Sequence, residues 1–127
     1  MIYIGIGSNL GNRLENIRQA IDLLKKEVLS NLNIMPILET EALLTNDAPI
    51  EWDKPFLNTV VCGESALAPQ DLLKKLKEIE VKLGEPNMRK KWQPRIIDLD
   101  ILLWNDLVLK TDSLAIPHSE LCNRPFF

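Results

Sequence analysis

The sequence predicts an α+β fold in which two helices pack on one mainly antiparallel sheet. Three observations support this. The 127 residues are 46% hydrophobic and 26% charged, the balance of a single globular domain. Two stretches carry apolar residues every three or four positions, and the stretches between them read as strands. No apolar run approaches the ~20 residues that a membrane helix needs.

The chain opens with a strand, a turn and a helix. Residues 2–7 alternate isoleucine with smaller or aromatic residues, which indicates a strand, and 7–11 reads as a turn. We interpret the three glycines of this region as turn residues, since their spacing is not that of a dinucleotide-binding loop. Asn12 and Glu15 have the spacing of a capping box. One apolar helix face follows, made of Leu14, Ile17, Ile21, Leu24 and Val28.

The middle of the chain repeats this order. We expect a strand around residues 34–40, a long aperiodic loop over 43–55, and a third strand over 56–63. Pro69 stands where a first helical residue belongs, and Gly84 ends the helix. The apolar face of this second helix consists of Leu72, Leu76, Ile79 and Leu83.

The last third begins with a polar, basic loop over 85–95, followed by a strongly apolar strand over 96–104. Asn105 and Asp106 resemble a two-residue hairpin turn into a strand over 107–109, and we expect the remainder to be irregular. The resulting order is that of the split βαβ, or ferredoxin-like, sandwich. This fold hosts many activities, so it does not decide the function.

Charge and cysteine content narrow the class of protein. The net charge of −3 argues against a nucleic-acid-binding domain of this size, and nothing indicates a membrane segment. Only residues 89–95 are locally basic, which favours a small anionic ligand. Cys62 and Cys122 lack metal-ligand spacing, and the N-terminus lacks the features of a signal peptide. We therefore expect reduced thiols and a cytoplasmic location.

Asp98 and Asp100 are the most informative residues. Side chains alternate along a strand, so the two carboxylates share one face, with Cα atoms ~6.6 Å apart. At an effective dielectric constant of 20 they would repel each other by roughly 2–3 kcal/mol. A divalent cation would turn that repulsion into binding, and an all-oxygen pair favours Mg²⁺. The alternative is a solvated strand face with two harmless acids.

The basic loop just before this pair suits a Mg²⁺-bound polyphosphate. Arg95 is the best candidate for a phosphate contact because Pro94 stiffens the chain before it. Trp92 would pack against a flat ring or cover the core. Alone, such a charge run would be read as a solvated turn.

Phe56 and Asn58 share one face of the third strand, where a ring beside an amide suits a planar heterocycle. A core phenylalanine and a strand-end asparagine are the alternative. His118, the only histidine, is a candidate for phosphate binding or acid–base chemistry, although a lone histidine more often does neither. Arg124 is similarly ambiguous.

Taken together, these residues resemble the 6-hydroxymethyl-7,8-dihydropterin pyrophosphokinase family of folate biosynthesis. The match spans 1–127 as one domain. Its segments, in order, are Gly5-Ile6-Gly7-Ser8-Asn9-Leu10-Gly11, Phe56-Leu57-Asn58, Trp92-Gln93-Pro94-Arg95-Ile96-Ile97-Asp98-Leu99-Asp100-Ile101-Leu102, Ile116-Pro117-His118 and Asn123-Arg124-Pro125-Phe126.

The resemblance implies that ATP donates its β,γ-diphosphate to the pterin hydroxymethyl group, leaving AMP. It implies two Mg²⁺ ions held by Asp98 and Asp100. The nucleotide site would comprise Glu80, Trp92, Arg95, Ile101, His118 and Arg124. Phe56 and Phe126 would sandwich the pterin, Asn58 would contact its edge, and Leu44 would wall the pocket. The segments 43–55 and 84–95 would close over the substrates.

The sequence departs from the family at three points. Glu85 stands where a basic residue is usual, so we expect Arg89 to take its place in catalysis. Ser119 replaces a common aromatic residue. The chain ends just after Phe126, where family members continue for a few tens of residues, so we expect the family's C-terminal tail to be missing.

Glu85 and the early end also leave open a catalytically weakened pterin- or nucleotide-binding module. A nucleotide-sugar transferase with an Asp-x-Asp metal site is a further alternative, for which the chain is short. We expect a monomer, and the sequence leaves open whether it is fused to, or associated with, another folate-pathway enzyme.

Overall fold

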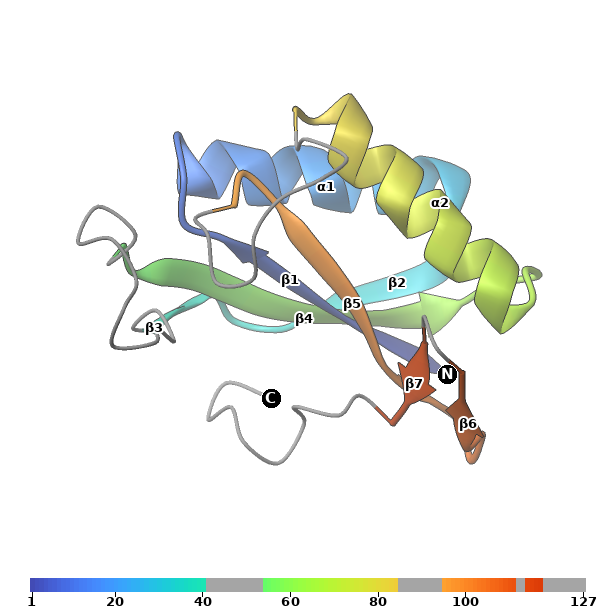
Figure 1. Ribbon diagram of the computed structural model, residues 1–127. Helices are drawn as coiled ribbons and strands as arrows, with labels where there is room; N and C mark the ends of the chain where they lie inside the picture. The colour runs from blue at the N-terminus through green and yellow to red at the C-terminus, as the bar shows by residue number, and fades with distance from the viewer. Residues whose placement is uncertain (41–53, 85–94, 112–113, 118–127) are drawn as a thin grey trace.

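Two helices lie on the same face of a five-stranded sheet in the computed structural model of the chain (Figure 1). The structure describes residues 1–40, 54–84, 95–111 and 114–117. This confirms the α+β, ferredoxin-like arrangement predicted from the sequence. The strands of this sheet and the two helices that cover it are, in chain order, β1 (Ile2–Ser8), α1 (Arg13–Glu27), β2 (Ser30–Ile34), β3 (Leu38–Thr40), β4 (Phe56–Glu64), α2 (Pro69–Lys82) and β5 (Asp98–Trp104).

The strand order is β2-β4-β1-β5, and β3 also pairs with β4. Every described pairing is antiparallel. β1 therefore lies in the interior of the sheet, between β4 and β5. Residues on β1 meet partners on both sides, and this makes β1 the strand around which the site is arranged.

Both helices begin, and α2 ends, for the reasons the sequence suggests. The Asn12 side chain accepts a hydrogen bond from the Glu15 amide at 3.2 Å and so caps α1. Pro69 occupies the first turn of α2. Gly84 follows α2 with a φ of +109°, a conformation that other residues rarely adopt. Leu14, which we expected on the apolar face of α1, is instead exposed.

The hydrophobic core fills the space between the helices and the sheet. Alternate residues of β1 and β5 point into it, together with the apolar faces of α1 and α2. Its largest fully buried side chains are Ile4, Ile6, Ile17, Leu24, Val61, Leu72, Leu76, Ile79, Ile97, Leu99, Ile101 and Ile116. Because side chains alternate along a strand, the intervening residues of β1 and β5 lie on the opposite face, away from the helices.

In place of one strand around 34–40 the structure has two, and the first begins earlier than predicted, at Ser30. β2 pairs with the C-terminal half of β4 and β3 with its N-terminal end. Pro36 lies between them and has no N–H to donate, so a continuous ladder is interrupted there.

The hairpin expected after β5 is wrong. Residues 105 and 106 do form a turn, but the next strand, β6 (Leu109–Lys110), pairs with β7 (Ala115–Ile116) in a separate two-stranded sheet. The outer edge of β5 faces α2 instead, where Glu80 accepts a hydrogen bond from the Leu99 amide. Among the described helices, none is long and apolar enough to span a membrane.

Candidate active site

Gly7 of β1 lies directly between a residue predicted to bind metal and one predicted to bind the heterocycle. Gly7 is opposite Asp98 on β5 and opposite Asn58 on β4. Gly5 is opposite Asp100. The prediction that these glycines are turn residues is therefore wrong for Gly5 and Gly7, which are inside the strand. It holds for Gly11, which has a φ of +73° in the β1–α1 turn.

The absence of a side chain at Gly7 leaves space that Phe56 and Asn58 occupy. A Cβ atom added at Gly7 would lie 2.9 Å from the Asn58 Oδ1 and 3.3 Å from the Phe56 ring. Asn58 is buried, and its Nδ2 donates to the Thr40 hydroxyl at 2.7 Å. The ring and the amide therefore lie together, as the sequence predicted, and β3 holds the amide in place.

On the other side of β1, Asp98 carries an unusual charge environment. Its carboxylate is buried, and Arg95 Nη1 lies 2.5 Å from its Oδ1. Burial, together with the negative charge of Asp100, raises the pKa of Asp98 from 3.8 to about 7, despite the opposing effect of Arg95. The site therefore holds more negative charge than its one described guanidinium offsets.

These carboxylates fit a divalent cation. Asp98 and Asp100 alternate with the core residues Leu99 and Ile101, so both lie on the face away from the helices. The raised pKa of Asp98, due mainly to burial and to the neighbouring charge of Asp100, is the effect that a bound cation would oppose. Among the described residues, no group of three or more His, Cys, Asp or Glu side chains forms a closed metal site. Two carboxylates suit Mg²⁺, which keeps waters and substrate oxygens as its other ligands.

Glu80 has a structural partner in this chain. Its side chain is 3% exposed, and Oε2 accepts a hydrogen bond from the Leu99 amide at 2.8 Å. Lys77 lies 3.4 Å from the other carboxylate oxygen. Leu99 stands between the two aspartates, so Glu80 holds the edge strand that carries them. Ile101, expected in the nucleotide site, has its side chain in the hydrophobic core.

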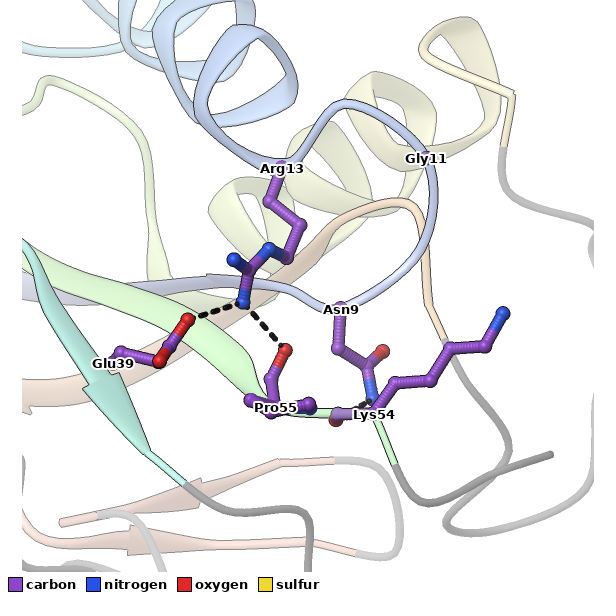
Figure 2. Close-up of a pocket in the computed structure, with 6 residues that line it drawn as sticks. All are labelled: Asn9, Gly11, Arg13, Glu39, Lys54 and Pro55. Carbon is purple, nitrogen blue, oxygen red and sulfur yellow. Dashed lines mark hydrogen bonds and ion pairs between the residues drawn. The ribbon is translucent and has the colours of Figure 1, made fainter. Parts of the chain in front are cut away.

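The β1–α1 turn reaches the starts of both neighbouring strands, as Figure 2 shows for the β4 side. Asn9 is buried and bonds to Lys54 and Arg95, while Arg13 Nη1 donates to the Pro55 carbonyl at 2.9 Å and pairs with Glu39 at 2.8 Å. An open pocket of about 270 Å³ lies here, lined by Asn9, Gly11, Arg13, Glu39, Lys54 and Pro55.

Sequence reasoning missed Gly5, Gly7, Asn9 and Thr40 as site residues. Gly5 and Gly7 are two residues apart within a strand, where glycine is uncommon, and this spacing could have indicated that other groups approach the strand closely there. Nothing local marks Asn9 or Thr40, whose partners are far away in sequence. Six predicted residues lie outside the described part of the chain: Leu44, Arg89, Trp92, His118, Arg124 and Phe126.

The sequence is similar to those of known proteins over almost its whole length. The sequence model of the 7,8-dihydro-6-hydroxymethylpterin-pyrophosphokinase family matches residues 3–127. The chain is 40% identical to a 2-amino-4-hydroxy-6-hydroxymethyldihydropteridine pyrophosphokinase of Aquifex aeolicus, over 99% of this chain and 74% of that protein.

Longer relatives also match. A folate synthesis bifunctional protein of Chlamydia caviae is 44% identical over 98% of this chain, and one of Arabidopsis thaliana is 36% identical over 98%. The chain spans 28% of the length of the first and 25% of the second. The family match over almost the whole chain agrees with the carboxylate pair and the ring–amide pair that the sheet brings together. The chain belongs to the 7,8-dihydro-6-hydroxymethylpterin-pyrophosphokinase family.

Proposed function

We propose that the chain transfers diphosphate from ATP to 6-hydroxymethyl-7,8-dihydropterin, giving AMP and the pterin diphosphate, in folate biosynthesis. The observation that carries this proposal is the position of Gly7, with Asn58 opposite it on one side and Asp98 on the other. One face of one sheet thus carries groups suited to a heterocycle beside groups suited to a metal-bound polyphosphate. Family membership supplies the identity of the two substrates.

The described residues divide this work in two. Phe56 stacks on the pterin ring, and Asn58 bonds to its polar edge, with the amide oriented by Thr40. Asp98 and Asp100 would hold two Mg²⁺ ions, whose charge would offset that of the phosphates and favour attack on the β-phosphorus. Arg95 neutralises Asp98 in the structure and contacts phosphate when the nucleotide is bound.

Most other parts of the proposal concern residues beyond the described ranges. We assign Trp92, His118 and Arg124 to the nucleotide site, Leu44 and Phe126 to the pterin site, and Arg89 to catalysis in place of the residue at position 85. We also keep the described residues Glu80 and Ile101 in the nucleotide site, although their side chains are buried. These assignments rest on the sequence motifs alone. The weakened binding module is not favoured, because both metal-binding carboxylates and the ring–amide pair are present and the family match is continuous.

The setting of the activity is also a proposal. The relatives from Chlamydia caviae and Arabidopsis thaliana are named as bifunctional folate synthesis proteins, which supports fusion to, or association with, another folate-pathway enzyme. We propose that the chain is otherwise monomeric. Cys62 is buried as a free thiol, in keeping with a cytoplasmic location.

The test is release of AMP from Mg-ATP with and without the pterin. We expect AMP to form only when the pterin is present. Asp98→Asn and Asp100→Asn should each lower kcat by a factor of about 100 or more, because they remove metal ligands from the reacting phosphates. Asp106→Asn is the matched control, since Asp106 lies exposed in the turn just after β5.

Each outcome is informative. Pterin-dependent AMP that disappears in the two site variants and persists in Asp106→Asn supports the proposal. AMP formation at the same rate with and without the pterin would contradict it. Pterin binding without AMP would instead establish the weakened binding module.

A further inference from the structure

We propose that Asn9 is a positioning residue that holds the pterin half and the nucleotide half of the site in register with each other. This inference rests on the proposed function and deepens it. Asn9 follows β1 directly, two residues after Gly7. It is 3% exposed, and its polar groups are bonded to the incoming ends of both strands that flank β1.

The first connection is to the strand that carries the aspartates. The Asn9 amide donates to the Arg95 carbonyl at 3.0 Å, and the Arg95 amide donates to the Asn9 Oδ1 at 2.7 Å. The side-chain oxygen takes the place that a main-chain carbonyl has in a β ladder. The β1–β5 ladder itself stops at the pair of Gly7 and Asp98. Asn9 therefore fixes Arg95, which lies three residues before Asp98 and outside that ladder.

The second connection is to the strand that carries the ring and the amide. Asn9 Nδ2 donates to the Lys54 carbonyl at 3.0 Å, which is visible in Figure 2. Lys54 precedes Phe56 by two residues, and the β1–β4 ladder stops at Ser8 and Leu57. Arg13 adds a more exposed contact to Pro55 on this same side. The Arg13 contact is to the β4 side, whereas Asn9 bonds to the starts of both strands.

An asparagine side chain suits this position better than aspartate or alanine. The Arg95 amide needs an acceptor and the Lys54 carbonyl needs a donor, and one planar amide supplies both at opposite ends. Aspartate offers no donor to Lys54, and alanine offers neither group. Because Asn9 is buried, partners left by a substitution are not readily satisfied by water.

The consequence for catalysis is specific. Each half of the site retains its own ladder without Asn9, so each substrate would still bind. What is lost is the mutual alignment of the two substrates, on which transfer depends strongly. We therefore expect Asn9→Ala to lower kcat about tenfold or more, while the separately measured Kd values for pterin and for Mg-ATP each rise less than about threefold.

Asn16→Ala is the matched control. Asn16 is a partly buried asparagine in the first turn of α1, and its Nδ2 donates to the Ser8 hydroxyl at 3.2 Å and the Leu10 carbonyl at 3.0 Å. These bonds stabilise the β1–α1 turn and are not to β4 or β5. We expect Asn16→Ala to lower Tm and to leave kcat within about threefold of wild type. Asn9→Asp keeps the acceptor for Arg95 and loses the donor to Lys54. It should lose kcat nearly as Asn9→Ala does, and it carries the test if the alanine variant does not fold.

Three results would overturn the inference: an unchanged kcat in Asn9→Ala, an equal loss in Asn16→Ala, or full recovery in Asn9→Asp. Backbone amide NMR spectra of the substrate-free protein give an independent readout. Asn9→Ala should shift signals near both Phe56 and Arg95, and shifts confined to one of them would contradict the coupling. If wild-type protein makes no AMP, the proposed function fails, and the spectra still decide whether Asn9 joins the two strands.

Discussion

Replacing Gly7 by alanine is expected to disturb pterin binding more than any other property of the protein. The added Cβ would lie 2.9 Å from Asn58 Oδ1, closer than real Cβ atoms approach an oxygen, and 3.3 Å from the Phe56 ring. Asn58 cannot turn away freely, because its Nδ2 bonds to Thr40 at 2.7 Å and the residue is buried. Either that hydrogen bond breaks or the ring moves.

The expected magnitude follows from these contacts. Forcing one methyl group into a packed site costs about 1–3 kcal/mol. Because the groups displaced are those that contact the pterin, most of this cost should appear in binding. A loss of about 1.4 kcal/mol is a tenfold weaker Kd. We therefore expect the pterin Kd to rise by about tenfold, with the Kd for Mg-ATP changed by less than about threefold.

The assay is calorimetric titration of pterin in the presence of a non-reactive ATP analogue, with Tm measured on the same samples. Gly63→Ala is the matched control, because Gly63 lies at the other end of the same strand pair, opposite Ile2. A Cβ there would lie 2.8 Å from the Ser30 carbonyl oxygen, a main-chain atom. It should lower Tm without weakening pterin binding to the folded protein.

An unchanged pterin Kd in Gly7→Ala would refute the reasoning, as would an equal loss in Gly63→Ala. The first result would mean that Asn58 and Phe56 do not contact the substrate from the positions described. The second would mean that the effect is transmitted through overall stability rather than through the contacts over Gly7.

Three further predictions follow from single contacts. Thr40→Val removes the acceptor of the Asn58 amide and should lower the free energy of unfolding by about 1–3 kcal/mol, with a lower Tm and weaker pterin binding. Unchanged pterin affinity would show that this hydrogen bond does not orient Asn58. Glu80→Leu leaves the Leu99 amide unpaired and should lower the free energy of unfolding by about 1–3 kcal/mol in urea titrations, whereas Glu80→Gln retains an acceptor and most of the stability. The pKa of Asp98 rises from 3.8 to about 7 on folding, so this group should stabilise the metal-free protein most below about pH 4, and that contribution should be lost as the pH rises through 7. In urea titrations from pH 5 to 8 the free energy of unfolding should therefore fall with pH, and Asp98→Asn should flatten this dependence. Mg²⁺ should raise Tm more at pH 8 than at pH 5.5.

Much of the site was predictable because its residues break local rules. Asp98 and Asp100 interrupt an apolar strand, and period-two alternation alone places them on the same face. The same reasoning paired Phe56 with Asn58. Helix limits were equally accessible, since Asn12, Pro69 and Gly84 act on the backbone next to them. In each case the physical cause lies within a few residues of its effect.

Errors arose where a partner distant in sequence decides the outcome. The hairpin after β5 was wrong because β6 pairs with β7, a later strand that also contacts β5. The glycines of β1 were read as turn residues because their cross-strand neighbours are about 50 and 90 positions away, and only pairing reveals what a side chain there would strike.

Local periodicity and motif order were enough to predict the two helices on a mainly antiparallel sheet, the shared face of the two aspartates, and the family. They could not show that Gly7 separates Asn58 from Asp98, or that Asn9 bonds to both Lys54 and Arg95. These relations depend on strand order and register. Both are set by burying one face of the sheet against α1 and α2, a condition that involves the whole chain at once.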